Sequence, residues 1–252
     1  MSSTDEPGQM PAIGELADSG AHPLDHVIWR ALTSRHRKVA EGDQLALRYP
    51  APIAPFAATI DVSTASFESL LGLLPAGDQI ALFTLEEITP PSFFSVIERG
   101  AVDQMVLAKM PSYAGSVPIV ELDGKDIPDM LALVEATHPG PFGARTIELG
   151  QYIGVRRQGI LVAMAGERMR LDSFTEISAV CVDPSYRGQG LAAELISALA
   201  RSIASCAETS FLHVFNSNRP AIDLYRKLGF VLRRHLHLAI LARASSEPQA
   251  ER

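Results

Sequence analysis

The passage from Ile177 to Leu195 limits what this chain can fold into more than any other part of the sequence. A strand, a glycine turn and a long helix follow one another there without a gap. Positions 174–182 are apolar on both faces, a pattern typical of a strand buried in the middle of a sheet. The strand is expected to end at Asp183, and positions 190–207 predict the helix.

Side chains along a strand alternate between its two faces. We therefore expect Ile177, Ala179 and Cys181 to face one way, and Val180 and Val182 to face the other. The helix carries one apolar stripe, which should pack against this sheet. The residues of that stripe are Leu191, Leu195, Leu199 and Ile203.

The turn between strand and helix has the chemistry of an anion site. Gly188 and Gly190 remove side chains that would block a close approach, so consecutive backbone N–H groups can point outward together. The positive end of the helix dipole adds to this, and the site suits a pyrophosphate. The glycine spacing matches neither a Walker loop nor a dinucleotide fingerprint. An ordinary strand–turn–helix connection remains the alternative interpretation of this motif taken alone.

A second passage, Asn218 to Phe230, predicts a compact helix with clear ends. Asn218 is a good N-cap, Pro220 fits the first turn, and Gly229 fits the position after the last turn. Tyr225 falls on the inward face, where its hydroxyl needs a partner. Taken alone, this residue is as well explained as a core tyrosine bonded to a backbone carbonyl.

Around these passages the chain predicts two structured stretches, residues 23–110 and residues 117–243, joined by a turn-rich segment at 110–116. Polar, aperiodic residues at 1–22 and 244–252 predict flexible tails. In the first stretch we expect a helix with Leu24, Val27, Ile28 and Leu32 on one face, strands at 44–48, 56–60, 79–84 and 102–108, and helices at 67–74 and from Pro91. In the second we expect a strand at 117–122, a helix at 127–136, a hairpin at 152–165, a strand at 211–215 and closing strands within 230–241.

Composition excludes several classes of function. The formal net charge is −7 and basic residues form no long run, so nucleic acid is not an expected partner. No uninterrupted apolar run of about twenty residues is present, so no membrane span is expected. The N-terminus lacks the pattern of a secretory signal. Cys181 and Cys206 have no metal-ligand spacing, and a reduced, cytoplasmic protein without a metal site is the simplest interpretation.

Together the two passages resemble the GNAT superfamily of N-acyltransferases. Arg187, Gly190 and Ala192 match the family's Gln/Arg-x-x-Gly-x-Gly/Ala signature. The second passage matches its Asn-x-x-Ala-x-x-x-Tyr-x-x-x-Gly-Phe pattern. The residues that match are Asn218, Ala221, Tyr225, Gly229 and Phe230.

The resemblance covers residues 117–243 and is closest to the glycine N-acyltransferase-like branch. It implies an α/β (α+β) GNAT fold, in which helices flank a mixed, mostly antiparallel sheet. The smaller α/β module at 23–110 resembles, less closely, a degenerate copy of the same fold.

The resemblance also implies acetyl-CoA as donor, an amine as acceptor and a set of site residues. Tyr225 would protonate the leaving thiolate, and amides at the end of the strand would polarise the thioester. The implied cofactor-binding residues are Val180, Cys181, Val182, Arg187, Gly188, Gln189, Gly190, Leu191, Ala192, Ala193 and Asn218.

The amine must also lose a proton, which requires a base or a chain of water molecules. Glu176 is the first candidate for the base and His213 the second, although each is equally well explained as an ordinary strand residue. His138 could contact the acceptor. Cys181 is a poor nucleophile if its strand is buried, so direct transfer is preferred to an acyl-enzyme.

Two functions remain open at this stage. The first is an N-acetyltransferase that acts directly on an amine. The alternative is a CoA-binding regulatory module without transfer activity. The sequence does not indicate the acceptor, the length of the acyl chain or the oligomeric state.

Overall fold

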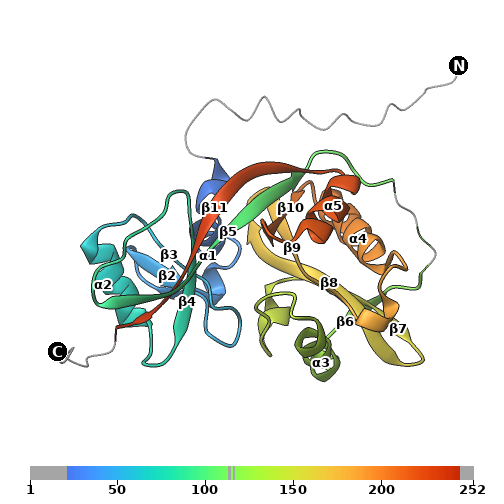
Figure 1. Cartoon of the computed structure of the whole chain (residues 1–252), viewed down its shortest axis with the longest axis horizontal. Helices are drawn as coiled ribbons and strands as arrows, with labels where there is room; N and C mark the ends of the chain where they lie inside the picture. The colour runs from blue at the N-terminus through green and yellow to red at the C-terminus, as the bar shows by residue number, and fades with distance from the viewer. Residues whose placement is uncertain (1–21, 113–114, 116, 245–252) are drawn as a thin grey trace, which may run out of the picture.

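Two long antiparallel strands, one from each half of the chain, form the centre of the molecule. The structure, a computed structural model, describes residues 22–112, 115 and 117–244. Apart from residues 22 and 244, the predicted tails lie outside the described residues, as does part of the 110–116 segment. The central strands are β5 (Phe94–Leu107) and β11 (Phe230–Arg243), and they pair along most of their length. Figure 1 shows them crossing between the two halves.

The large sheet has eight strands in the order β4-β11-β5-β10-β9-β8-β7-β6. Its other strands are β4 (Gln79–Thr84), β6 (Val120–Leu122), β7 (Tyr152–Arg157), β8 (Ile160–Leu171), β9 (Phe174–Val182) and β10 (Thr209–Phe215). All neighbouring pairs are antiparallel except β9 and β10. The predicted fold class, a mixed and mostly antiparallel sheet flanked by helices, is confirmed.

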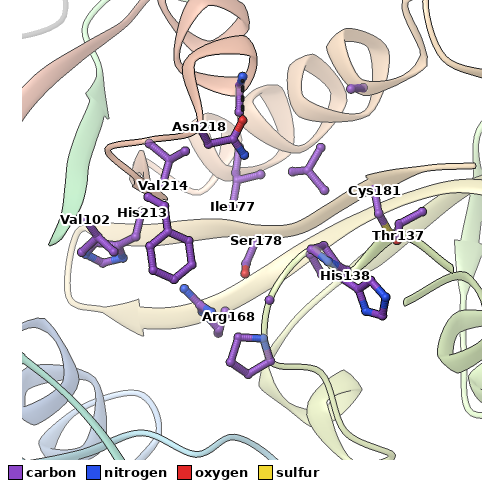
Figure 2. A pocket seen from close by; sticks show the side chains of 18 of the residues that line it. Val102, Thr137, His138, Arg168, Ile177, Ser178, Cys181, His213, Val214 and Asn218 are labelled. Atoms are coloured by element: carbon purple, nitrogen blue, oxygen red, sulfur yellow. Dashed lines mark hydrogen bonds between the residues drawn. The ribbon is translucent and has the colours of Figure 1, made fainter. Parts of the chain in front are cut away.

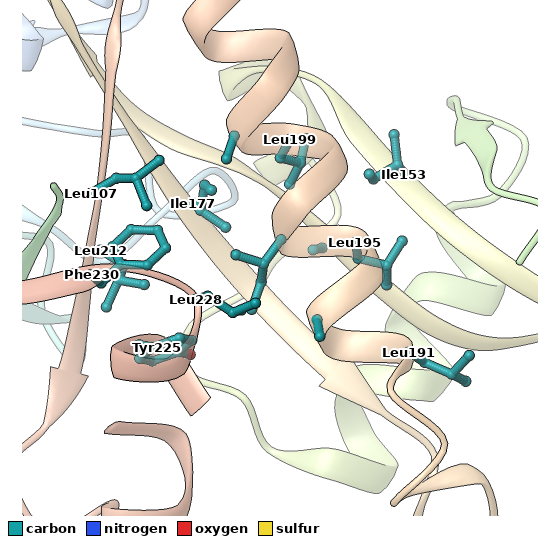
Figure 3. Packing of buried hydrophobic residues seen from close by; sticks show 14 of the residues in the cluster. Leu107, Ile153, Ile177, Leu191, Leu195, Leu199, Leu212, Tyr225, Leu228 and Phe230 are labelled. Atoms are coloured by element: carbon teal, nitrogen blue, oxygen red, sulfur yellow. The ribbon is translucent and has the colours of Figure 1, made fainter. Parts of the chain in front are cut away.

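Helices cover both faces of the second half of this sheet (Figure 1). On one face lie α4 (Leu191–Ser205) and α5 (Arg219–Lys227), and on the other lies α3 (Ile127–Thr137). The predicted stripe of α4 is buried against the sheet, and Figure 3 shows Leu191, Leu195 and Leu199 along the helix, with Ile177 and Ile153 on either side. Burying each leucine contributes about 1.5–3 kcal/mol, so this stripe fixes the helix on the sheet.

The first half adds a small sheet and two helices. Its remaining elements are α1 (Val27–Thr33), β1 (Glu41–Gly42), β2 (Ala46–Arg48), β3 (Ala57–Thr59) and α2 (Thr64–Leu73), with β1, β2 and β3 forming a three-stranded sheet. The predicted apolar face of the first helix is buried, spread over a short 3₁₀ turn and α1. No helix among the described residues is long and apolar enough to cross a membrane.

The two halves share part of one element order, but among the described residues the first half has no helix that corresponds to α5. In the second half, β8 and β9 lead through α4 to β10, and then through α5 to β11. In the first half, β2 and β3 lead through α2 to β4 and then to β5. The parallel pairing of β9 with β10 has a counterpart in a single parallel bridge between Phe56 and Ala81. That the first half is a degenerate copy of the same fold stays a prediction.

Two expectations about secondary structure are wrong. The helix expected from Pro91 is absent, because β5 begins at Phe94 and continues to Leu107. Its thirteen paired positions with β11 outweigh the local helix signal. The closing strands expected within 230–241 are one continuous strand, β11, because it runs along both β4 and β5.

The expected alternation along β9 is also wrong at one position. Ile177, Val180 and Val182 pack with the α4 cluster, whereas Ala179 and Cys181 pack on the α3 side. Ala179 has φ +50°, and the pairing with β8 shifts between Ser178 and Cys181. This β-bulge adds one residue, which reverses the faces of the side chains that follow it.

Candidate active site

A cavity of about 1080 Å³ opens where β9 and β10 separate. Their parallel pairing stops at Glu176 and Phe211, and the rest of β10 pairs only with β5 among the described strands. The edge of β9 beyond the bulge therefore keeps free backbone groups. Such an edge can pair with an extended chain of amide groups.

The glycine turn forms one end of the cavity. Gly188 and Gly190 have φ values of +76° and +79°, which glycine adopts without strain. A Cβ at Gly188 would meet nothing within 4 Å on the protein side, so the turn leaves open space above its backbone. Arg187 folds back and donates from Nε to the Val182 carbonyl at 3.4 Å, which ties the turn to the strand.

The first turn of α4 presents its N–H groups without a cap. Gly190 occupies the N-cap position and no side chain bonds to the first amides of the helix. Unpaired amides at a helix N-terminus need a partner, and an anion provides one. Leu191, Ala192 and Ala193 line the cavity at this point. The residues present therefore fit the pyrophosphate of CoA.

Asn218 and Tyr225 line the same cavity from α5. The Asn218 side chain accepts the Ala221 amide at 3.3 Å and caps the helix, as predicted. Tyr225 is buried against Phe230, and its hydroxyl forms no hydrogen bond with another described residue. Burial raises the pKa of Tyr225 to about 12, so the side chain remains a phenol at neutral pH.

Most residues that the sequence predicted for the site lie around this cavity. Those that line it are Val180, Cys181, Val182, Arg187, Gly188, Gly190, Leu191, Ala192, Ala193, His213, Asn218 and Tyr225. Gln189 and Glu176 do not line it. Burial raises the pKa of the Cys181 thiol to about 11, which keeps the sulfur protonated and weakly nucleophilic.

Glu176 is fully buried beneath the cavity wall. Its carboxylate accepts two hydrogen bonds from Arg168, from Nε at 2.9 Å and from Nη2 at 2.6 Å. Although burial favours the neutral acid, the charge of Arg168 and the hydrogen bonds from Arg168 and His213 lower the pKa of Glu176 to about 2. A carboxylate with such a pKa is a weak base.

His213 has both ring nitrogens engaged. Nδ1 lies 2.8 Å from Glu176 Oε1, and Nε2 lies 3.0 Å from the amide nitrogen of Gln104. The same amide nitrogen donates to the Leu24 carbonyl, and Arg233 donates to Gln104 Oε1, which together fix the orientation of the amide. His213 Nε2 must then accept a hydrogen bond, so Nδ1 carries the proton.

The other end of the cavity is built by residues that sequence analysis missed. Arg168 and Ser178 lie there, and Figure 2 shows them with His213 on one side and His138 on another. The first half of the chain contributes Phe56, Ile80 and Phe83. One signal was available: the charged residues Glu167, Arg168 and Arg170 directly follow an apolar run at 160–166.

Comparisons with known proteins agree with this fold. A family model described as FR47-like protein matches residues 152–238. A structure from Novosphingobium aromaticivorans, described as an acetyltransferase of the GNAT family, has a TM-score of 0.83 and 37% identity, and the match covers 89% of this chain and 100% of that chain.

Two further similarities are more limited. A GCN5-related N-acetyltransferase from Kribbella flavida has a TM-score of 0.57 at 16% identity, covering 87% of this chain and 96% of that chain, which shows the fold alone. The uncharacterized protein ML0378 of Mycobacterium leprae is 35% identical over 104 residues. That match spans 38% of this chain and only 28% of the length of ML0378.

Proposed function

The chain belongs to the GNAT family, and from that premise we propose that it transfers an acetyl group from acetyl-CoA directly to a primary amine. One observation carries the proposal. A single cavity joins an uncapped helix N-terminus, the free edge of a splayed strand and the hydroxyl of Tyr225. These three features match the pyrophosphate, the pantetheine arm and the leaving sulfur of one CoA thioester.

The pyrophosphate binds the turn at Gly188 and the first amides of α4. The pantetheine amides pair with the free edge of β9 from Val180 to Val182, in place of the missing β10 partner. The thioester carbonyl then lies at the bulge, where a strand amide donates to its oxygen. Such a donor stabilises the negative charge that develops as the amine attacks.

The amine nitrogen attacks the carbonyl carbon, so a C–N bond forms and the C–S bond breaks. Tyr225 donates its phenolic proton as the sulfur leaves, and solvent returns a proton to the phenolate. The amine nitrogen loses one proton to water in the cavity, which balances the proton that solvent returns to Tyr225. The products are the N-acetyl amine and free CoA thiol.

The assignment of Glu176 or His213 as the general base stays a prediction, and the contacts of both residues favour a different role. Glu176 does not line the cavity, and both nitrogens of His213 already have partners. We propose that they are positioning residues: Glu176 holds Arg168 and the His213 ring in place at the acceptor end. A cytoplasmic location also stays a prediction.

The substitution Tyr225→Phe tests the proposal. Removing the acid should lower turnover by about a hundredfold or more, because general acid catalysis contributes that much. Affinity for acetyl-CoA should stay unchanged, since the hydroxyl contacts only the sulfur late in the reaction. Turnover is followed by thiol release with a panel of amines, and affinity by calorimetry. Full turnover in the variant would contradict the acid assignment.

A further inference from the structure

Arg168 is a buried cation with one side left open to the cavity. Its side chain is only 10% exposed. Nε and Nη2 bind Glu176, while Nη1 has no hydrogen-bond partner among the described residues. The guanidinium carbon lies 4.7 Å from the centre of the Phe56 ring, so its face is held against an aromatic side chain. The free N–H groups are therefore fixed in direction.

Both carboxylate oxygens of Glu176 already accept hydrogen bonds from the protein, which hold the side chain away from a ligand. Besides Arg168, its oxygens accept from His213 Nδ1 at 2.8 Å and from the Met169 amide at 3.3 Å. Among the described residues, no second carboxylate lies within ion-pair distance of Arg168. The cavity therefore meets the cationic side of this pair, and an acceptor oxygen can reach it.

Most of the cavity lining contributed by the first half of the chain and by β11 is apolar, with Gln79 and Glu98 as its polar members. The Phe83 ring lies 4.8 Å from the His213 ring and closes one side. The apolar side chains that line this end are Phe56, Ile80, Phe83, Val102, Leu238 and Ile240. An acceptor with an apolar body would bury its surface here.

Register places Arg168 close to the reaction centre. Glu167 pairs with Ile177, so Arg168 stands beside the part of β9 just before the bulge at Ala179. Two strand residues, roughly 7 Å, separate Ser178 from Val180. This short distance limits the acceptor. A molecule whose oxygen is bound at Arg168 can place its amine nitrogen at the thioester only if that oxygen and that nitrogen are a few bonds apart.

We propose that Arg168 binds the carboxylate of the acceptor and that the acceptor is an amino acid with a large apolar side chain. This inference rests on the proposed function and specifies the substrate class for the same site. A guanidinium with fixed N–H groups prefers a carboxylate to a neutral group. The hydroxyl of Ser178, which lines the same end, is placed to donate a second hydrogen bond.

Matched ligand pairs test this proposal. Calorimetry on the full chain, saturated with CoA, compares L-phenylalanine with phenethylamine and L-leucine with 3-methylbutylamine. Each pair differs only by the carboxylate. We expect each amino acid to bind about tenfold or more tightly than its matched amine, as a charge-assisted hydrogen bond predicts. Equal binding, or tighter binding of the amines, would overturn the proposal.

A double substitution, Arg168→Gln with Glu176→Gln, removes the guanidinium without leaving a buried charge unpaired. The preference for the amino acids should disappear, and unchanged affinity for CoA shows that the variant is folded. The control is Arg145→Gln with Glu148→Gln, a bidentate pair of the same kind at the exposed surface with distances of 2.6 and 2.8 Å. A preference retained in the Arg168 variant, or lost in the control, would overturn the proposal.

Thiol release separates this inference from the proposed function. Acetylation of the simple amines without preference for the amino acids would support transfer and refute the role of Arg168. Tight binding of the amino acids without thiol release would support the role of Arg168 and refute transfer.

Discussion

The two halves of the chain each begin a helix just after a strand, but they treat the N-terminus of that helix in opposite ways. In the first half, β3 leads to α2, and in the second half β9 leads to α4. Each helix is followed by a strand that pairs in parallel with the chain that precedes the helix: β10 with β9 in the second half, and Ala81 with Phe56 in the first half. Because the surroundings are alike, the difference lies in the turns.

The turn before α2 is closed by its own side chains. Asp61 accepts the Ser63 amide at 3.0 Å and the hydroxyls of Ser63 and Ser66 at 2.6 Å. The Ser63 hydroxyl in turn caps the Ser66 amide. These hydrogen bonds lower the pKa of Asp61, which keeps it negatively charged. A carboxylate already occupies the place that an anion would take.

The turn before α4 has no such side chains. Gly188 and Gly190 leave the backbone bare, and the first amides of the helix have no cap. The comparison indicates that a strand followed by a helix does not by itself provide an anion site. The site requires a turn that leaves the first amides of its helix without a side-chain cap, which is true of the turn before α4 and not of the turn before α2.

The largest effect is expected from a change that tests whether the halves are one folding unit. Glu176→Gln leaves Arg168 buried without its partner, which costs about 3–5 kcal/mol. Because β5 and β11 interlock the halves, we expect one cooperative thermal transition at lower temperature. Two separate transitions, with the first half unaffected, would contradict this account of the sheet.

The same residue predicts a pH dependence in the acid range. The folded-state pKa of Glu176 is about 2, below its ordinary value of 4.5. Its contribution to stability is therefore fully present above about pH 4.5 and is lost as the pH falls toward 2. Urea titrations from pH 6 to pH 2 should show this loss in the wild type and a shallower dependence in Glu176→Gln.

A second change separates the glycine turn from an ordinary turn. Gly188→Trp should weaken acetyl-CoA binding by about a hundredfold or more, equivalent to ~2.8 kcal/mol, because the side chain fills the pyrophosphate site. Gly77→Trp is the matched control, since Gly77 also has positive φ (+87°), also has open space around it and does not line the cavity. Equal loss in both variants would point to strain and not to the site.

The smallest effect is expected at the closed turn. Ser63→Ala removes the cap of α2 and should lower the free energy of unfolding by about 1 kcal/mol. Acetyl-CoA binding should not change, because Asp61 and the side chain of Val62 remain in the turn. Weaker binding in this variant would mean that the first half contributes to the CoA site directly.

Local signals made the second half predictable. The apolar run of β9, the leucine stripe of α4 and the capped helix from Asn218 each stand within a few neighbouring residues. The cofactor end of the cavity is built from these segments, so most of its residues could be named from the sequence. The bulge at Ala179 was not predicted, because no sequence pattern indicates that an alanine adopts a positive φ.

The position of β5 and the acceptor end of the cavity could not be predicted from the sequence, because they depend on pairing between strands that are far apart in the chain. β5 enters the sheet between β10 and β11, and nothing in residues 94–107 indicates those partners. The acceptor end depends on these pairings, because β5 brings Gln104 to His213 and β4, which pairs with β11, carries Phe83. Arg168 can be recognised as a site residue only through its ion pair with Glu176, which lies eight residues away on a different strand.

The central claim is that the chain has one acyl-CoA site, formed by the open turn of the second half. Calorimetric titration of the full chain with acetyl-CoA tests it most directly. We predict saturable binding of one molecule per chain, which Gly188→Trp weakens by about a hundredfold or more and Gly77→Trp preserves. Two molecules bound per chain would show that the closed turn also forms a site, and no binding at all would contradict the claim entirely.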